Sequence, residues 1–318
     1  MRNLKSYSDF VGVRYEPKLS WAETVFFPVQ YDLKKLKKHK GKGGKIIQRL
    51  DGIYYPSKHG DQYLELNASI KEIYLDLADH IVFQSDYSRR QCFDMFGEIP
   101  GDKYSLITNG VDRRLFKEKS KKDIKQKEKF RLVSTGNFRN IDMLEPVIKA
   151  LDGLSASFQL DLIGPIVNES LKVYLDRPYV NYLGAMNSQS IADILPTYDI
   201  FIYSHLNPPC PNSVLEAVSC GIPVVGYDSG GMKELLPFSS ALLAEASDDL
   251  FQQYCDFIPE KLKGKIELCM TEYPFWKKTA MENCKMHDFE TCGKKYLDLF
   301  KRFSSLRRAK RTFFGLHW

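Results

Sequence analysis

Glu216 lies in a segment whose residue types and spacing could bind a sugar and a phosphate. Residues 209–225 read PCPNSVLEAVSCGIPVV, and GGMKELL follows at 230–236. A carboxylate in the first turns of a helix starting near Pro211 or Asn212 can accept hydrogen bonds from sugar hydroxyls, and the helix N-terminus favours an anion. Gly230 and Gly231 let a backbone approach a phosphate closely. Together these motifs indicate a nucleotide-sugar site.

Each motif alone has a purely structural alternative. A glutamate near a helix start can simply complement the helix dipole, and Cys-Gly-x-Pro can be a helix stop before a strand. The functional interpretation depends on their combination and on the elements that precede them.

Those elements alternate between apolar strands and helices from about residue 130 onward. The predicted strands are 130–137, 158–165, 179–186, 200–206, 222–230 and 241–246, and the predicted helices are 141–151, 169–175, 188–198, 212–220 and 232–236. Continuously apolar strands between helices are typical of a parallel sheet covered on both faces. The fold class is therefore α/β, with a doubly wound sheet whose ligands bind beyond the carboxyl ends of the strands.

The first 115 residues contain fewer such units. Strands are predicted within 45–55, 80–88 and 103–112, with helices at 67–80 and 87–97, and one further strand is predicted in ETVFFPVQYD at 23–32. With 318 residues the chain is long enough for two domains.

The basic residues are concentrated in two segments. Residues 34–45 hold seven lysines and residues 301–318 hold six Lys or Arg; without these 13, 33 of the 46 basic residues remain against 40 acidic ones. Such segments can attract an anionic membrane surface, and a solvated loop and a frayed terminus are the alternative. We find no sequence signature that supports nucleic-acid binding.

The cysteines, the histidines and the start of the chain indicate the cellular compartment and the absence of disulfide and metal-site motifs. Seven scattered cysteines without Cys-x-x-Cys, and six histidines without His-x-x-x-His spacing, predict neither disulfides nor a metal site. The chain has no apolar run long enough to span a membrane and no signal core, so we expect a cytoplasmic protein. The basic segments Lys34–Lys45 and Lys301–Trp318 are the candidates for peripheral contact with the inner membrane surface.

Six segments, in this order, resemble the retaining glycosyltransferases of family 4, within glycosyltransferase group 1. They are RLDG (49–52), HIVFQSDYSRR (80–90), LITNGVDRRLF (106–116), STGNFRN (134–140), CPNSVLEAVSCGIPVV (210–225) and GGMKEL (230–235). The resemblance implies the GT-B fold, in which two Rossmann-like doubly wound parallel-sheet domains face a cleft. The expected domains are a short N-terminal acceptor-side domain at 1–118, a nucleotide-sugar-binding domain at 119–285, and at 286–318 a helix crossing back to the first domain plus a basic tail.

The resemblance also implies an activity and its residues. A hexosyl group would pass from a nucleotide-diphosphate sugar to a hydroxyl, with retained anomeric configuration and without metal, in polysaccharide or lipid-linked glycan assembly. Asp51 and Glu216 match catalytic positions, and Asp51 and Gly52 stand where many members have His-Gly near the transferred sugar. Residues expected to bind the donor are Gly136, Asn137, Arg139, Leu183, Met186, Asn212, Ser213, Glu216, Gly230, Gly231 and Met232.

The sequence departs from the family at three places. Pro208 stands where a second acid is usual, eight residues before Glu216, and Asn137 and Asp142 align with the usual diphosphate-binding Arg and Lys, leaving Arg139 nearby. The usual glycine-rich turn is absent before residue 40. A second hypothesis is therefore a catalytically impaired protein that binds a nucleotide or glycan without turnover; a nucleotide-sugar epimerase is a more remote third.

Overall fold

The computed structural model describes residues 14–15, 19–118, 126–246, 251–252, 258–303 and 311–314. The chain divides into two compact units. Unit 1 comprises Met1–Gly110, Phe251–Gln253 and Phe289–Trp318, and unit 2 comprises Val111–Leu250 and Tyr254–Asp288. The sequence-based boundaries lay after residues 118 and 285. The division differs from them by eight residues at the first boundary and three at the second.

Unit 2 is built on a six-stranded sheet in which every pairing is parallel. Its strands are β6 (Lys129–Thr135), β7 (Ser157–Ile163), β8 (Val180–Gly184), β9 (Ile200–Tyr203), β10 (Val224–Asp228) and β11 (Leu243–Glu245). Their order across the sheet is β11-β10-β9-β6-β7-β8. All six predicted strands of this unit are present.

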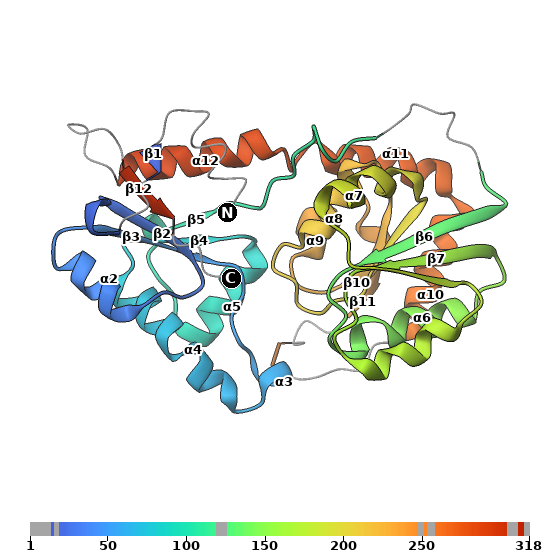
Figure 1. Ribbon diagram of the computed structural model, residues 1–318, viewed down its shortest axis with the longest axis horizontal. Coiled ribbons are helices and arrows are strands. Elements are labelled where there is room, and N and C mark those ends of the chain that lie inside the picture. Colours follow the sequence, from blue (N-terminus) through green and yellow to red (C-terminus); the bar gives the residue numbers. More distant parts are fainter. Residues whose placement is uncertain are drawn as a thin grey trace. The chain divides into compact units, whose positions relative to one another are not determined.

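Helices cover both faces of this sheet (Figure 1). They are η4 (Ile141–Met143), α6 (Glu145–Asp152), η5 (Glu169–Asp176), α7 (Ser188–Ile194), η6 (Leu195–Thr197), α8 (Asn212–Ser219), α9 (Met232–Leu235), η7 (Ser240–Leu242), α10 (Pro259–Thr271) and α11 (Tyr273–Cys284). Residues 169–175, predicted to be helical, form the 3-10 helix η5.

Neighbouring strand residues enter two separate cores because successive side chains of a strand point to opposite faces. Leu132 packs in the cluster that includes side chains of α6 and α10, whereas Val133 packs in the cluster that includes side chains of α7, α8 and α9. Both side chains have 0 % exposure. The continuous apolar runs therefore reflect burial on both faces.

Unit 1 holds a second six-stranded sheet, ordered β1-β12-β2-β3-β4-β5 and parallel at each pairing. Its strands are β1 (Arg14–Tyr15), β2 (Thr24–Pro28), β3 (Lys45–Leu50), β4 (His80–Phe83), β5 (Tyr104–Leu106) and β12 (Arg311–Phe314). β12 lies between β1 and β2, so residues near the C-terminus complete this sheet. Of the predicted basic tail, residues 304–310 and 315–318 lie outside the described residues.

The helices of unit 1 also pack on both faces of its sheet. They are η1 (Leu19–Trp21), α2 (Leu33–Lys40), α3 (Pro56–His59), α4 (Gln62–Glu72), the π-helical η2 (Ile73–Leu77), α5 (Asp86–Phe96), η3 (Gly101–Lys103) and α12 (Phe289–Arg302). Phe300 of α12 packs on one face against Phe26 and Ile47, and Leu36 of α2 packs on the other against Val25 and Ile46. The alternative that residues 34–45 are a solvated loop is wrong for 34–40, because Leu36 and His39 anchor a helix there.

Candidate functional site

The order of the unit 2 strands creates a switch point between β6 and β9. From β6 the chain proceeds outward through β7 and β8, then returns to β9 on the other side of β6. The loops after β6 and β9 therefore leave the sheet in opposite directions, which is where parallel α/β sheets bind ligands. The first loop carries Gly136, Asn137 and Arg139, and the second leads to α8 and Glu216.

Glycines let the loops at this carboxyl edge pack backbone against backbone. A Cβ on Gly164, whose φ is +129°, would lie 1.9 Å from the carbonyl oxygen of Gly136. The amide of Gly164 donates to the carbonyl of Gly184 at 2.7 Å, which ties the ends of β7 and β8 together. A Cβ on Gly136 would in turn lie 2.7 Å from the ring of His205. The four strand ends therefore form one packed surface.

The Gly230–Gly231 turn packs against the loop that follows β9. The amide of Gly231 donates to the carbonyl of Pro208 at 2.8 Å, and a Cβ on Gly230 would lie 2.4 Å from that same oxygen. Ser229 accepts a hydrogen bond from the amide of Asn207 at 2.8 Å through its Oγ. Met232 is fully buried, so its side chain packs in the core and does not face a ligand.

Asn207 has a left-handed backbone, with φ +49°, and its side chain is 6 % exposed. Its Oδ1 accepts from the Ser229 hydroxyl at 3.3 Å, while its Nδ2 finds no hydrogen-bond partner among the described residues. A buried amide donor without a partner is costly, so Nδ2 is a donor that a bound ligand can satisfy.

Glu216 is the fifth residue of α8 and lies in its second turn, which agrees with the predicted place in the first turns of this helix. Its side chain is half-buried, and within the described part of the chain no hydrogen bond or ion pair to its carboxylate is formed. Burial raises the pKa of Glu216 from 4.5 to about 7. Favourable dipole placement does not explain this residue, because the dipole effect fades beyond the first turn.

Helix α8 is held in place by its apolar face and its C-terminal turn. Val214, Leu215 and Val218 are buried, and Gly221 ends the helix with φ +70°. At the other end the N-cap is Pro211, which supplies no side-chain acceptor to the first-turn amides. Asn212 is exposed and Ser213 is half-buried at this end.

Two further predicted regions border the same edge. Leu183 and Met186, at and after the end of β8, pack partly buried against the core that includes α8. Asn137 and Arg139 are exposed after β6, and the Arg139 side chain makes no ion pair with another described residue. Asp142 is half-buried in η4. Arg139 is therefore a cation available near the switch point.

In unit 1, Asp51 follows β3 and is engaged by a neighbouring cation. Arg49 Nε lies 2.7 Å from Asp51 Oδ1, and Arg49 Nη2 donates to Asn109 Oδ1 at 2.8 Å. Burial raises the pKa of Asp51, against the opposing charge of Arg49. Gly52 follows with φ +144°. The turn after β2 lacks the usual glycines, and Val29 adopts φ +56° there.

Sequence reasoning missed His205, Asn207 and Arg49. His205 lies against Gly136, and its ring centroid is 4.8 Å from that of Tyr203. The available signal was a polar residue immediately after an apolar strand, as in IFIYSHLN at 200–207. Arg49 was hidden inside a predicted strand, where its role as the partner of Asp51 has no spacing signature.

Comparison with known proteins identifies the domain that carries this edge. Residues 129–258 match the family model described as glycosyl transferases group 1. Most of unit 2 therefore resembles a group 1 glycosyltransferase domain. The chain is 29% identical over 153 residues to a phosphatidylinositol N-acetylglucosaminyltransferase subunit from Arabidopsis thaliana, and 30% identical over 114 residues to the corresponding Homo sapiens protein. The matches cover 46% and 34% of this chain, and 34% and 24% of those relatives.

Solved structures extend the glycosyltransferase likeness over both units at the level of fold. Anabaena Alr3699/HepE in complex with UDP-glucose has a TM-score of 0.67 at 17% identity, with 88% of this chain and 79% of that chain covered. Sucrose-phosphate synthase from Thermosynechococcus elongatus has a TM-score of 0.68 at 15% identity, covering 88% and 73%. The chain has the GT-B fold expected from its sequence. In the parts of the chain described, no helix is both long and apolar enough to cross a bilayer.

Proposed function

We propose that this glycosyltransferase homologue moves a hexosyl group from a nucleotide-diphosphate sugar to a hydroxyl acceptor, with retention and without metal. The observation that carries the proposal is Glu216. Its half-buried carboxylate has no partner among the described residues, and its pKa is raised to about 7 by burial alone. Sugar hydroxyls would supply the missing hydrogen bonds, so the site is completed by a ligand.

The donor diphosphate would lie between the loops after β6 and β9. Arg139 would supply the positive charge that Asn137 and Asp142 lack, and the first-turn amides at Asn212 and Ser213 would stabilise the leaving diphosphate. Gly230 and Gly231 would hold their backbone close to the donor sugar. Leu183 and Met186 would border the base.

For the acceptor we propose a lipid-linked hydroxyl in glycan assembly. The two curated relatives are named for transfer of N-acetylglucosamine and for phosphatidylinositol, which supports an acceptor presented by a lipid. Asp51 and Gly52 are the unit 1 residues that we propose for the acceptor side. Such chemistry fits a cytoplasmic protein working at a membrane surface, with Lys34–Lys45 in contact with anionic lipid.

The test is a donor screen in the presence of EDTA. Purified protein is mixed with UDP- and GDP-sugars, and binding is followed by thermal shift while release of nucleoside diphosphate is followed enzymatically. We expect release above the no-protein control, lost in Glu216→Ala and retained in Glu267→Gln, an exposed glutamate of α10. Restoration of turnover only by added Mg²⁺ would contradict the metal-independent mechanism, and the anomeric configuration of the product tests retention.

The contribution of Arg139 can be measured separately from turnover. In the wild type a nucleoside diphosphate should bind more tightly than the monophosphate, and Arg139→Gln should reduce that preference by about tenfold or more, as expected for a charge-assisted hydrogen bond. Arg177→Gln, which removes an exposed partner of Asp152 in the same unit, is the matched control. An unchanged preference in Arg139→Gln would remove Arg139 from the site.

The second candidate function is binding without turnover. It is favoured by Pro208, whose carbonyl accepts from Gly231 and whose ring offers no acid to a transferred sugar. Stabilisation by a nucleotide without release of diphosphate, across lipid and glycan acceptors, would support this candidate and contradict the transferase.

A further inference from the structure

Unit 1 contains a cavity of about 660 Å³ that lies away from Asp51 and that the proposed transfer reaction does not use. Its lining includes Glu23, which directly precedes β2, and Lys45, which opens β3. The hydroxyl of Thr24 donates to the carbonyl of Phe303 at 3.0 Å, which places Phe303 at the same strand starts. The cavity therefore lies at the amino edge of the sheet, and Asp51 lies beyond the other end of β3, roughly 20 Å away by strand rise.

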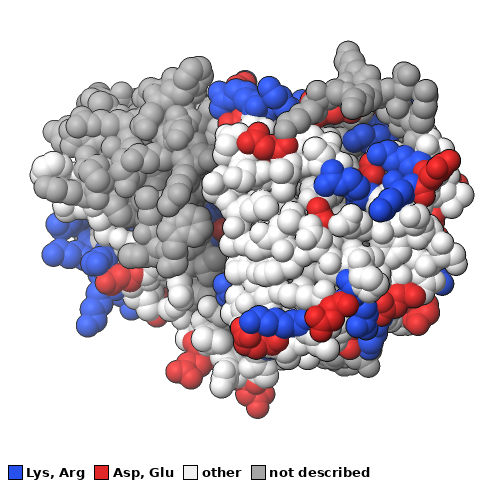
Figure 2. Space-filling view, turned by 45° about the vertical axis from the view of Figure 1, so that its right-hand side comes forward, with Lys and Arg blue, Asp and Glu red and all other residues white. Residues whose placement is uncertain are grey.

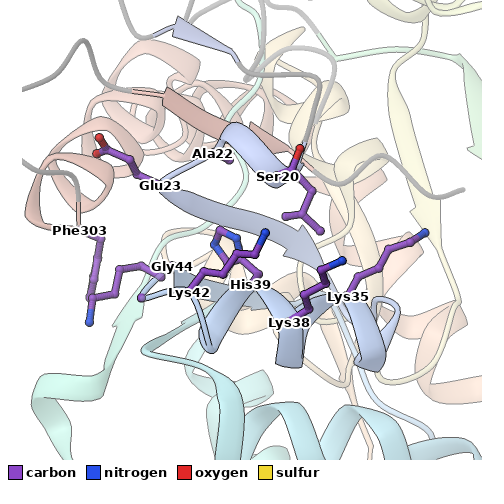
Figure 3. A pocket seen from close by; sticks show the side chains of 12 residues that line it. Ser20, Ala22, Glu23, Lys35, Lys38, His39, Lys42, Gly44 and Phe303 are labelled. Carbon is purple, nitrogen blue, oxygen red and sulfur yellow. The ribbon is translucent and has the colours of Figure 1, made fainter.

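Lysines line one side of this cavity (Figure 3). Lys35, Lys38 and Lys42 are spaced by three and four residues, which places the side chains of Lys35 and Lys38 on one face of α2. Lys38 and Lys42 form no ion pair within the described residues, whereas Lys45 is held by Asp79 at 3.1 Å. In Figure 2 basic side chains gather at the lower left of the view, on the side where α2 lies in Figure 1. Two cations here therefore lack an acidic partner in the described part of the fold.

Apart from the lysines and the polar side chains of Ser20, Glu23 and His39, the lining is apolar or glycine. Leu19, Ala22 and Phe303 contribute to it, and Trp21, adjacent in sequence to the lining residues Ser20 and Ala22, is 58 % exposed. An exposed tryptophan beside a lysine cluster is typical of surfaces that meet the headgroup layer of a bilayer, where one end of the indole is apolar and the other is polar. A free phosphate would use the lysines alone and leave the apolar lining unoccupied.

We propose that this cavity binds an anionic phospholipid, with the lipid phosphate at Lys38 and Lys42 and the start of its chain against Leu19, Ala22 and Phe303. The inference deepens the membrane contact of the proposed function by giving it a discrete site. It does not depend on transfer, because the cavity and Asp51 are at opposite edges of the sheet. A bound lipid would hold unit 1 at the membrane without occupying the acceptor side.

The experiment measures binding to vesicles of phosphatidylcholine with and without about a third phosphatidic acid. Two variants carry the same charge change on neighbouring residues: Lys38→Gln with Lys42→Gln inside the cavity, and Lys34→Gln with Lys37→Gln on α2 but outside it. Each lysine near a lipid surface contributes about fivefold, so we expect the first pair to weaken binding about thirtyfold. The second pair should weaken it less than fivefold. Equal losses in both pairs would show binding by surface charge alone and overturn the proposal.

A third variant tests the apolar lining without changing charge. Ala22→Trp fills the cavity, and we expect it to weaken saturable binding of a soluble short-chain phosphatidic acid at least tenfold, with an unchanged melting temperature. Glycerol 3-phosphate and inorganic phosphate are the competing ligands, and each should displace the short-chain lipid only at far higher concentration. Displacement at equal concentration would assign the site to a soluble anion and overturn the lipid assignment. Loss of donor turnover with retained lipid binding would contradict only the proposed function.

Discussion

Replacing Glu216 by glutamine should stabilise the protein above neutral pH. The pKa of Glu216 is raised from 4.5 to about 7 by burial, so the folded chain keeps this carboxyl protonated over a range in which the unfolded chain ionises it. The stabilisation from the protonated form is complete below about pH 4.5 and is lost as the pH rises toward 7. At pH 8 this shift in pKa corresponds to a loss of at most about 3 kcal/mol in the free energy of unfolding.

Glutamine has the shape of the protonated acid but cannot ionise. The free energy of unfolding of Glu216→Gln should therefore exceed that of the wild type by up to about 3 kcal/mol at pH 8, and the difference should vanish near pH 4.5. Urea unfolding at several pH values measures it. Glu267→Gln, an exposed glutamate of α10, is the control and should show no pH-dependent difference. A difference for Glu216→Gln that does not change with pH would refute the reasoning.

Ionisation of the same carboxyl, which destabilises the free protein, should strengthen ligand binding. If ribose hydroxyls donate to the ionised form of Glu216, the affinity for a nucleoside diphosphate should fall about tenfold from pH 8 to pH 6, because only about a tenth of the carboxyl is ionised at pH 6. Isothermal titration calorimetry measures this slope, and Glu216→Gln should bind weakly with little pH dependence. A slope that survives in Glu216→Gln would assign the titration to another group.

Three further predictions concern stability. Gly230→Ala should lower the free energy of unfolding by more than about 2 kcal/mol, because the φ of Gly230 is +62° and its Cβ would lie 2.4 Å from a backbone carbonyl oxygen. Gly264→Ala, in the open middle of α10, should instead raise the free energy of unfolding by about 0.5 to 1 kcal/mol. Thermal unfolding compares the two variants. Burial lowers the pKa of His80 to about 4, so the wild type should lose roughly 3 kcal/mol more than His80→Gln as the pH falls from 7 to 4, seen by urea titration at each pH. Asp199→Ala should cost about 1 to 3 kcal/mol in chemical denaturation, because it removes the acceptor of the buried Tyr273 hydroxyl and of the Arg131 amide; a cost below about 0.5 kcal/mol would contradict this.

The sheet of unit 2 could be predicted from sequence because its strands are buried on both faces. Burial on both sides requires apolar residues at every position, so segments such as FIY at 201–203 read as strands without alternation. The start of α8 at Asn212 and its C-cap at Cys220 also followed from local signals. What local signals could not give was the packing of separate loops, such as the contact between Gly136 and His205.

Unit 1 was harder to predict because long-range pairing decides its elements. The helix α2 has two buried side chains, Leu36 and His39, in a segment dominated by lysine, so its charge hid its apolar face. The strand β12 pairs with β2, about 290 residues earlier in the chain, and nothing in residues 311–314 indicates that partner. Sequence periodicity describes which face of an element is buried, but the element against which it packs is set by the whole fold.

The carboxyl edge of unit 2 contains two kinds of residue that respond to substitution in opposite ways. Gly230 and Gly164 hold the backbone in place, so any side chain there should destabilise the folded chain. The half-buried Glu216 carboxylate and the buried Nδ2 of Asn207 are instead polar groups that the described fold leaves without hydrogen bonds, and their removal should stabilise the free protein while weakening the ligand complex. Burying such groups costs free energy, and only a bound ligand restores it. A gain in stability that accompanies a loss of binding would therefore separate the residues that meet the donor from those that only shape its site.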